Sequence, residues 1–148
     1  MKFNSLLPEL YVTDFKKSLN FYTEILRFKV EYQRNDPNFA FLSYQSSQLM
    51  IQELVPGEKE KMKLEYPFGR GINFQIETGN VRQIIDSLKW HNYPIKRGVK
   101  DNWYQGRNTR YGCREILVLD PDGYLLRFSQ DIGEKMSRDP KRSSAVRF

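Results

Sequence analysis

One arginine in this sequence stands among apolar residues of a strand-like segment, where its charge needs a partner. Arg127 alternates with Leu126 and Phe128 in the last such segment. A buried charge without a partner is costly, so its guanidinium group should contact either a carboxylate or an anionic ligand. We predict an internal salt bridge with Glu9 or Glu77. The alternative is a bidentate contact to a carboxylate or phosphate of a bound ligand.

Nucleophilic catalysis finds no support in the sequence. Cys113 is the only cysteine and has no histidine beside it, while His91 is the only histidine and has no evident acidic partner. Ser129 lacks the glycine-flanked turn that presents a catalytic serine. We therefore assign no catalytic residue. A single cysteine also excludes an intrachain disulfide, which favours a reducing, cytoplasmic setting.

The composition is that of a globular protein with excess positive charge. The 148 residues are 39% hydrophobic and 14% aromatic, enough for one compact domain with a buried core. No apolar run is long enough to cross a membrane, and the first residues lack the apolar segment of a signal peptide, so we expect no membrane partner. Five basic and two acidic residues in 134–148 supply half of the net charge of +6. We predict a flexible basic tail there and no nucleic-acid partner, because a solvated tail accounts for this charge.

Apolar and polar residues alternate in two stretches that read as the first strands of two similar units. Leu10 and Val12 share one face of the first stretch, and Phe74 and Ile76 share one face of the second. The opposite, polar faces carry Glu9, Tyr11, Asn73, Gln75 and Glu77. An amphipathic helix follows each stretch, one after Asp14 and one after Asn80, and both of these side chains are suited to capping a first turn.

Three further strands complete each unit. They are predicted at 28–33, 39–44 and 48–54 in the first unit, and at 95–99, 114–119 and 124–129 in the second. Trp103 and Tyr104 lie in the longer loop and ribbon that follow 95–99. The predicted organisation is one domain over residues 1–133, with module one at 1–56, a connection at 57–70 and module two at 71–133, followed by the tail at 134–148.

Short motifs stand at matching places in the two units. They are Val12-Thr13-Asp14 and Ser18-Leu19-Asn20-Phe21-Tyr22 in the first, and Asp120-Pro121-Asp122-Gly123-Tyr124 in the second. In these motifs and in the order of its two units, the chain resembles the vicinal oxygen chelate superfamily. That superfamily includes glyoxalase I, extradiol dioxygenases, fosfomycin-resistance enzymes and bleomycin-resistance proteins. The stretch 67–75, the Trp103-Tyr104 pair and Leu125-Leu126-Arg127-Phe128 are most similar to the bleomycin-resistance-like branch. The resemblance implies an α+β fold in which two tandem βαβββ modules form a concave mixed sheet, the glyoxalase/bleomycin-resistance fold, and it implies a homodimer.

The resemblance also implies a divalent metal, held in the enzymes of this superfamily by residues of the first and last strand of each unit. When the superfamily's ligand positions are transferred to this sequence, they fall near Leu7, Gln52, Asn73 and Arg127. None supplies a good ligand, and Arg127 puts a permanent positive charge where the metal would lie. We therefore predict no metal and no other cofactor. The alternative is a hard-metal site with displaced ligands, built from Glu9, Gln52, Glu53 or Glu77, in a metal-dependent lyase or dioxygenase.

We therefore predict that the polar faces of the strands form a cleft that binds a ligand without catalysing a reaction. The predicted ligand-binding residues are Glu9, Tyr11, Gln52, Asn73, Gln75, Trp103, Tyr104 and Arg127. Phe39, Phe41 and Phe68 either add aromatic walls or belong to the core or a dimer interface. Our first hypothesis is a metal-free small-molecule binding protein that sequesters a drug or metabolite, as in antibiotic resistance. Bleomycin is cationic and this chain is basic, so the expected ligand is an aromatic or anionic small molecule.

Overall fold

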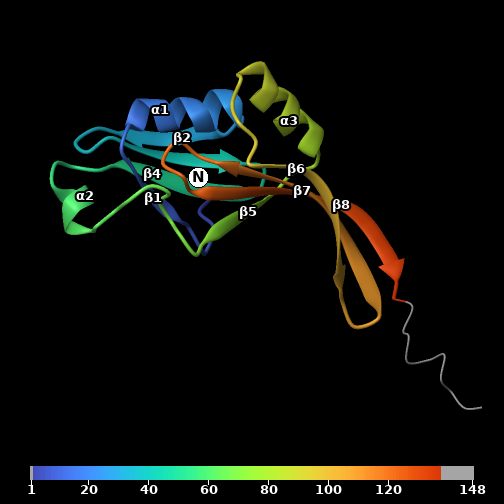
Figure 1. Ribbon diagram of the computed structural model, residues 1–148. Helices are drawn as coiled ribbons and strands as arrows, with labels where there is room; N and C mark the ends of the chain where they lie inside the picture. Colours follow the sequence, from blue (N-terminus) through green and yellow to red (C-terminus); the bar gives the residue numbers. More distant parts are fainter. Residues whose placement is uncertain (1, 138–148) are drawn as a thin grey trace, which may run out of the picture.

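The chain folds into two sheets, each with four strands, and a few helices (Figure 1). This computed structural model describes residues 2–137, and the predicted tail from Arg138 onward lies outside them. Module one contains β1 (Glu9–Val12), α1 (Phe15–Asn20), the π-helical η1 (Phe21–Ile25), β2 (Lys29–Arg34), β3 (Phe39–Tyr44) and β4 (Ser47–Glu53). The short helix α2 (Glu58–Lys61) lies in the connection. Module two contains β5 (Asn73–Glu77), α3 (Val81–Trp90), β6 (Arg97–Gln105), β7 (Thr109–Leu119) and β8 (Leu125–Met136).

The two modules have the same topology. Sheet A has the order β1-β4-β3-β2, and sheet B has the order β5-β8-β7-β6. The first and last strands of each module pair in parallel, and the other pairs are antiparallel. A helical crossover allows the parallel pairing. The predicted α+β fold of two βαβββ modules is confirmed.

Local signals account for where the helices begin and end. The side chain of Asp14 accepts a hydrogen bond from the backbone of Lys17, and that of Asn80 accepts one from the backbone of Arg82, so both predicted N-caps form. Arg27, which follows the first helical segment, has a left-handed φ of 67°. The first helix is not a single α-helix, because it continues after Asn20 as a π-helical turn.

One core joins both modules beneath the helices. Figure 1 shows α1 and α3 on the same side of the strands. The strand residues that face this layer and are buried in the shared core include Leu10, Val12, Ile76, Ile116, Leu126 and Phe128. Alternation therefore leaves the opposite face of each sheet without a helical cover. We call these the open faces of sheets A and B.

The turn between β7 and β8 fastens module two to module one. Asp120 accepts a hydrogen bond from the hydroxyl of Tyr22 at 2.8 Å. Asp122 accepts hydrogen bonds from the backbone and the hydroxyl of Thr13. The hydroxyl of Tyr124 donates to the backbone oxygen of Tyr11 at 3.0 Å. These contacts join segments about 100 residues apart in sequence and fix the strands on either side of the turn.

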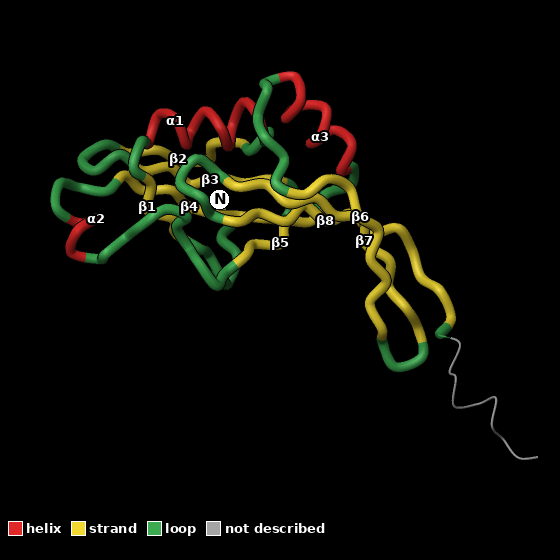
Figure 2. The backbone as a smooth tube through the Cα atoms, viewed as in Figure 1, coloured by secondary structure: helices red, strands yellow, loops and turns green. Residues whose placement is uncertain are grey.

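The outer halves of β6, β7 and β8 extend beyond the body of the molecule as an arm (Figure 2). Trp103 lies within β6 and opposite Gly112 of β7, whereas the sequence predicts a longer loop and ribbon there. The predicted module boundary at residue 133 falls inside β8, which continues to Met136. Within residues 2–137, no helix is long and apolar enough to span a membrane.

Candidate functional site

The open face of sheet B carries a layer of polar and charged side chains in two adjacent rows. Register partners point to the same side of a sheet, so each row can be read from the strand pairing. One row contains Gln75, Arg127, Leu117 and Arg97, and the next contains Glu77, Ser129, Glu115 and Lys100. Sequence alternation predicts this face for Gln75, Glu77 and Arg127, and the structure adds residues of β6 and β7.

The partner of Arg127 is Glu115, not Glu9 or Glu77 as the sequence analysis predicts. Nη1 of Arg127 lies 3.6 Å from Oε1 of Glu115. Nη2 of Arg97 approaches the other carboxylate oxygen, Oε2, at 3.8 Å. The Glu115 side chain is 1% exposed, whereas those of Arg127 and Arg97 are 28% and 40% exposed. A buried carboxylate therefore lies between two partly exposed guanidinium groups.

Two further side chains of β6 hold Glu115 in place. The amide of Asn102 donates a hydrogen bond to Oε2, and the hydroxyl of Tyr104 donates another to the same oxygen at 3.0 Å. Desolvation of the phenol, together with this hydrogen bond to Glu115, raises the pKa of Tyr104. Tyr104 therefore remains a neutral hydrogen-bond donor at physiological pH. We call Arg97, Asn102, Tyr104, Glu115 and Arg127 the Glu115 cluster.

The Glu115 cluster has unused hydrogen-bonding capacity. Among the described residues, Oε1 of Glu115 and the Nε atoms of Arg97 and Arg127 are buried and form no hydrogen bond. Both ion-pair distances exceed the range of a hydrogen bond, so the guanidinium donors are not consumed by Glu115. Buried polar atoms in native proteins nearly always have partners, which makes this cluster unusual for a purely structural one.

Trp103 and Tyr104 do not line the same cleft, because consecutive residues of a strand point to opposite faces. Tyr104 joins the Glu115 cluster on the open face. The ring of Trp103 packs over Gly112, and Nζ of Lys135 lies 3.7 Å from its centroid. The sequence predicts both aromatics at one site because they fall in a longer loop and ribbon, to which strand alternation is not applied.

Two shallow hollows lie along β5, at one edge of sheet B, and Gln75 lines both. One, of about 170 Å³, lies among Gln75, Glu77, Cys113, Ser129 and Asp131. The other, of about 350 Å³, brings Asn73 and Gln75 against Leu6, Pro8 and residues 46–49 of module one. The predicted residues Asn73 and Gln75 therefore border space for a small molecule. Arg127 pairs in register with Gln75 but lines neither hollow.

The predicted site residues of module one form a separate group. Tyr11 pairs in register with Gln52, and Oε1 of Gln52 accepts a hydrogen bond from Arg34 at 3.3 Å. Glu9 lies along the same strand, opposite Met50. Among the described residues, no hydrogen bond or ion pair joins Glu9, Tyr11 or Gln52 to the Glu115 cluster.

The three candidate aromatic walls are buried. Phe39 and Phe41 alternate with the core residues Ala40 and Leu42, and they pack against Tyr32 and Phe3 respectively. Phe68 belongs to the shared core, where its ring meets Tyr124 edge-on. Phe68 therefore fills space in the core. Phe39 and Phe41 are buried but lie outside the shared core, on the open face of sheet A, where they pair in register with Gln52 and Met50.

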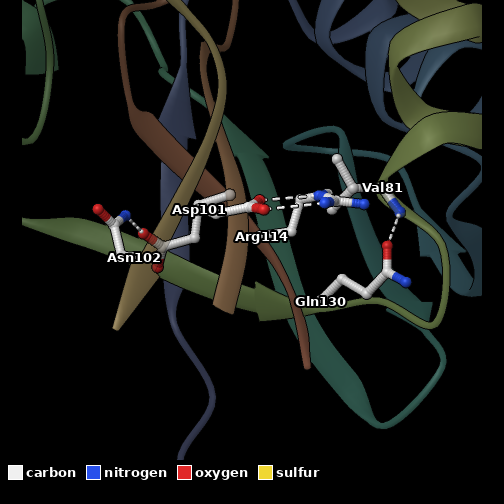
Figure 3. Close-up of polar contacts among 6 residues, drawn as sticks. Val81, Asp101, Asn102, Arg114 and Gln130 are labelled. Atoms are coloured by element: carbon white, nitrogen blue, oxygen red, sulfur yellow. Dashed lines mark hydrogen bonds and ion pairs between the residues drawn. The ribbon is translucent and has the colours of Figure 1, made fainter. Parts of the chain in front are cut away.

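A larger hollow lies on the helical side of sheet B, away from the Glu115 cluster. It has a volume of about 580 Å³ between the start of α3 and the arm. Figure 3 shows Arg114 directed at Asp101 and Gln130 directed at Val81, with Asn102 pointing away from this group. Arg114 makes two hydrogen bonds to Asp101, at 2.8 and 2.9 Å, and Gln130 accepts from the Val81 backbone at 3.0 Å. The polar groups here already satisfy one another.

The residues present do not fit a divalent metal. Within residues 2–137, no group of three His, Cys, Asp or Glu side chains is arranged to hold one. At the alignment positions, Gln52 is bonded to Arg34, and Arg127 is a cation beside Glu115. The carboxylate of Glu53 accepts a hydrogen bond from Asn38 at 2.6 Å, and His91 contacts the backbone oxygen of Ser87 at the end of α3. An amide and a guanidinium group are poor donors for such a cation.

Sequence reasoning missed Glu115 and Arg97 as members of the site. Glu115 alternates with Ile116 and Val118, so strand parity was a signal that it faces away from the helices. Arg97 carried no comparable signal, because it lies at the start of β6 next to a register irregularity. Its place beside Glu115 depends on the strand pairing.

Comparisons with known proteins agree with this architecture. A family model described as Glyoxalase/Bleomycin resistance protein/Dioxygenase superfamily matches residues 2–128. Glyoxalase domain-containing protein 4 of Rattus norvegicus is 26% identical over 139 residues, covering 93% of this chain and 45% of the relative, so the chain spans about half of that protein. The bleomycin resistance protein of Geobacillus stearothermophilus is 27% identical over 135 residues, covering 85% of this chain and 96% of the relative. The crystal structure of TioX from Micromonospora sp. ML1 superposes with a TM-score of 0.62 at 15% identity, covering 87% and 99% of the two chains, a likeness that shows the fold alone.

Proposed function

Because the chain belongs to the Glyoxalase/Bleomycin resistance protein/Dioxygenase superfamily, we propose that it binds a small molecule against the open face of sheet B without a metal. The observation that carries this proposal is the Glu115 cluster, in which Arg127 stands at one of the expected ligand positions and a second guanidinium group, that of Arg97, lies beside the same carboxylate. Such a face can hold a ligand by hydrogen bonds and charge, but it offers no Lewis acid. Sequestration of a drug or metabolite is the function that follows.

A second copy of the chain is part of the proposal. Phe3, Leu6 and Ile72 are more than half exposed, and Leu6 lines the hollow beside Asn73 and Gln75. Apolar side chains gathered beside a binding face are typical of a surface that another protein chain covers. A homodimer formed there would enclose the ligand and deepen the shallow hollows.

The alternative enzyme, a metal-dependent lyase or dioxygenase with displaced ligands, has no comparable support. Glu53 is engaged by Asn38 in module one, whereas Glu77 lies in the hollow on module two. A single metal ion needs several donors within about 2.0–2.6 Å of it. Plasma mass spectrometry of the purified protein after dialysis against manganese, iron, nickel and zinc tests both readings. We expect no stoichiometric metal, and a value near one per chain would favour the enzyme.

Replacing Arg127 with alanine should weaken binding at this face by about tenfold, because a charge-assisted hydrogen bond to a ligand contributes about 1.5 kcal/mol or more. The probes are naphthalene derivatives that carry a carboxylate, an amide or an amine, and the measurement is isothermal titration calorimetry in a chelating buffer. Backbone NMR shifts should locate the best probe near Gln75, Leu117 and Arg127.

Arg82→Ala is the matched control. Arg82 lies on α3, exposed and paired with Asp86, so its loss changes the net charge equally without touching the open face of sheet B. Equal affinity of wild type and Arg127→Ala for every probe would contradict the site, and so would shifts confined to α3.

A further inference from the structure

We infer that the binding face selects ligands with a carboxylate-like oxyanion, held by Arg97 and Arg127, and that Glu115 acts as a built-in counter-ion that limits their affinity. This inference rests on the proposed function, since it assumes a ligand at this face. It adds the chemical class of the ligand and a role for Glu115 that the sequence did not indicate.

The charges of the Glu115 cluster favour an anion. Two guanidinium groups surround one carboxylate, which leaves a net charge of one positive unit at the centre of the face. Lys100 pairs in register with Glu115 and is a third cation at the edge, but it is exposed, so water screens its charge. Glu77 and Asp131 lie in the neighbouring hollow, but both are exposed and their charges are screened by water.

The guanidinium donors that form no hydrogen bond also favour an oxyanion as the ligand. Arginine offers five N–H donors and no acceptor, so only a ligand that supplies acceptors can satisfy it. Arg97 and Arg127 meet Glu115 at 3.8 and 3.6 Å, too far for hydrogen bonds. Their side chains are 40% and 28% exposed, so a ligand can approach them, although the Nε atoms themselves are buried. A carboxylate has two oxygens with the spacing that guanidinium groups bind best. A neutral ligand would leave the positive charge uncompensated.

Glu115 is placed to compete with such a ligand. Its side chain is buried, so water cannot screen it from the two arginines, yet within residues 2–137 it forms hydrogen bonds only with Asn102 and Tyr104. It therefore lowers the positive potential of the arginines without occupying their donors. Substitution by glutamine keeps the shape and an oxygen that can accept from Asn102 and Tyr104, and it removes one negative charge.

The test compares 2-naphthoate with its neutral isostere 2-naphthamide, using calorimetry on the full chain. Glu115→Gln should bind 2-naphthoate about tenfold more tightly than wild type, because a close like charge has been removed. Arg97→Gln should bind it about tenfold more weakly, because one cation has been lost. The affinity for 2-naphthamide should not change in either variant. Arg82→Gln, which makes the same charge change as Arg97→Gln on the exposed face of α3, should leave both probes unaffected.

The outcomes separate this inference from the proposed function. If 2-naphthamide binds as tightly as 2-naphthoate and the variants do not distinguish them, the face binds small molecules but the inference is wrong. If Glu115→Gln is folded and binds 2-naphthoate more weakly, Glu115 positions the arginines and its role as a competitor is overturned. If neither probe binds at this face, the proposed function fails and the inference fails with it. Should Glu115→Gln not fold, as judged by circular dichroism, the response of Arg97→Gln to the two probes decides the ligand class.

Discussion

Replacing Gly123 with alanine is expected to destabilise the protein by about 3 kcal/mol or more, measured as the free energy of unfolding in urea. Gly123 has φ of +91°, a conformation that L residues adopt at a cost. An added Cβ would lie 2.6 Å from the Cα and Cβ atoms of Pro67 and 2.9 Å from the Tyr66 ring. Because Pro67 presents its backbone, the contact cannot be relieved by rotating a side chain. The turn itself must move.

Gly57→Ala separates the two causes. Gly57 also has a left-handed φ, +88°, but a Cβ there would meet no atom within 4 Å. It should therefore show only the backbone cost, about 1–2 kcal/mol. If Gly123→Ala lowers the free energy of unfolding no more than Gly57→Ala does, Pro67 moves aside at little cost. A large excess would show that the turn is held rigidly, as its hydrogen bonds to Thr13 and Tyr22 require.

The second large effect concerns Asp120 in the same turn and depends on pH. Burial raises the pKa of Asp120 from 3.8 to about 6, even though the hydrogen bond from Tyr22 lowers it. A carboxyl group with a raised pKa in the folded state stabilises the fold most when it is protonated, below its unfolded pKa. That contribution is lost as the pH rises through about 6. A shift of about two units corresponds to about 3 kcal/mol.

Asp120→Asn should therefore become more stable relative to wild type as the pH rises from 4 to 7, by up to about 3 kcal/mol. The amide oxygen can still accept from the backbone N–H groups of Asp122 and Tyr124, and the amide nitrogen can donate to the hydroxyl of Tyr22. Urea unfolding at several pH values measures the difference between the two proteins. A difference that stays flat from pH 4 to 7 would contradict the assignment.

Asp101→Asn is the control with the opposite sign. The hydrogen bonds from Arg114 lower the pKa of Asp101, so its contribution to stability is present above the unfolded pKa and is lost as the pH falls. Asp101→Asn should therefore lose stability relative to wild type as the pH rises. Opposite trends in the two variants would tie each effect to its own carboxyl group rather than to the net charge.

Both predictions concern the geometry of the proposed binding face. The turn that contains Asp120 and Gly123 follows β7, which carries Glu115, and precedes β8, which carries Arg127. In the hairpin that results, Leu117 is opposite Arg127 and Ser129 is opposite Glu115. A change in the turn would therefore alter the distance between the guanidinium group and the carboxylate. Variants of the turn are expected to affect ligand binding as well as stability.

The sequence determined the architecture because its signals are local. Alternation at Leu10 and Val12 and at Leu126 and Phe128 places these residues on the core face without reference to any neighbouring strand. Asp14 and Asn80 mark the helix starts through hydrogen bonds to residues two or three positions ahead. Repetition of the same order in both halves then suffices to predict two βαβββ modules.

The site depended on contacts that no local pattern encodes. Arg127 was recognisable as a charge in need of a partner, but the choice of Glu115 over Glu9 or Glu77 follows from how β7 and β8 pair and from where the side chains converge. Trp103 and Tyr104 separate because β6 continues as a strand through both of them, supported by pairing with β7. Strand order and register arise from packing of the whole chain, so only the tertiary structure decides which charges meet.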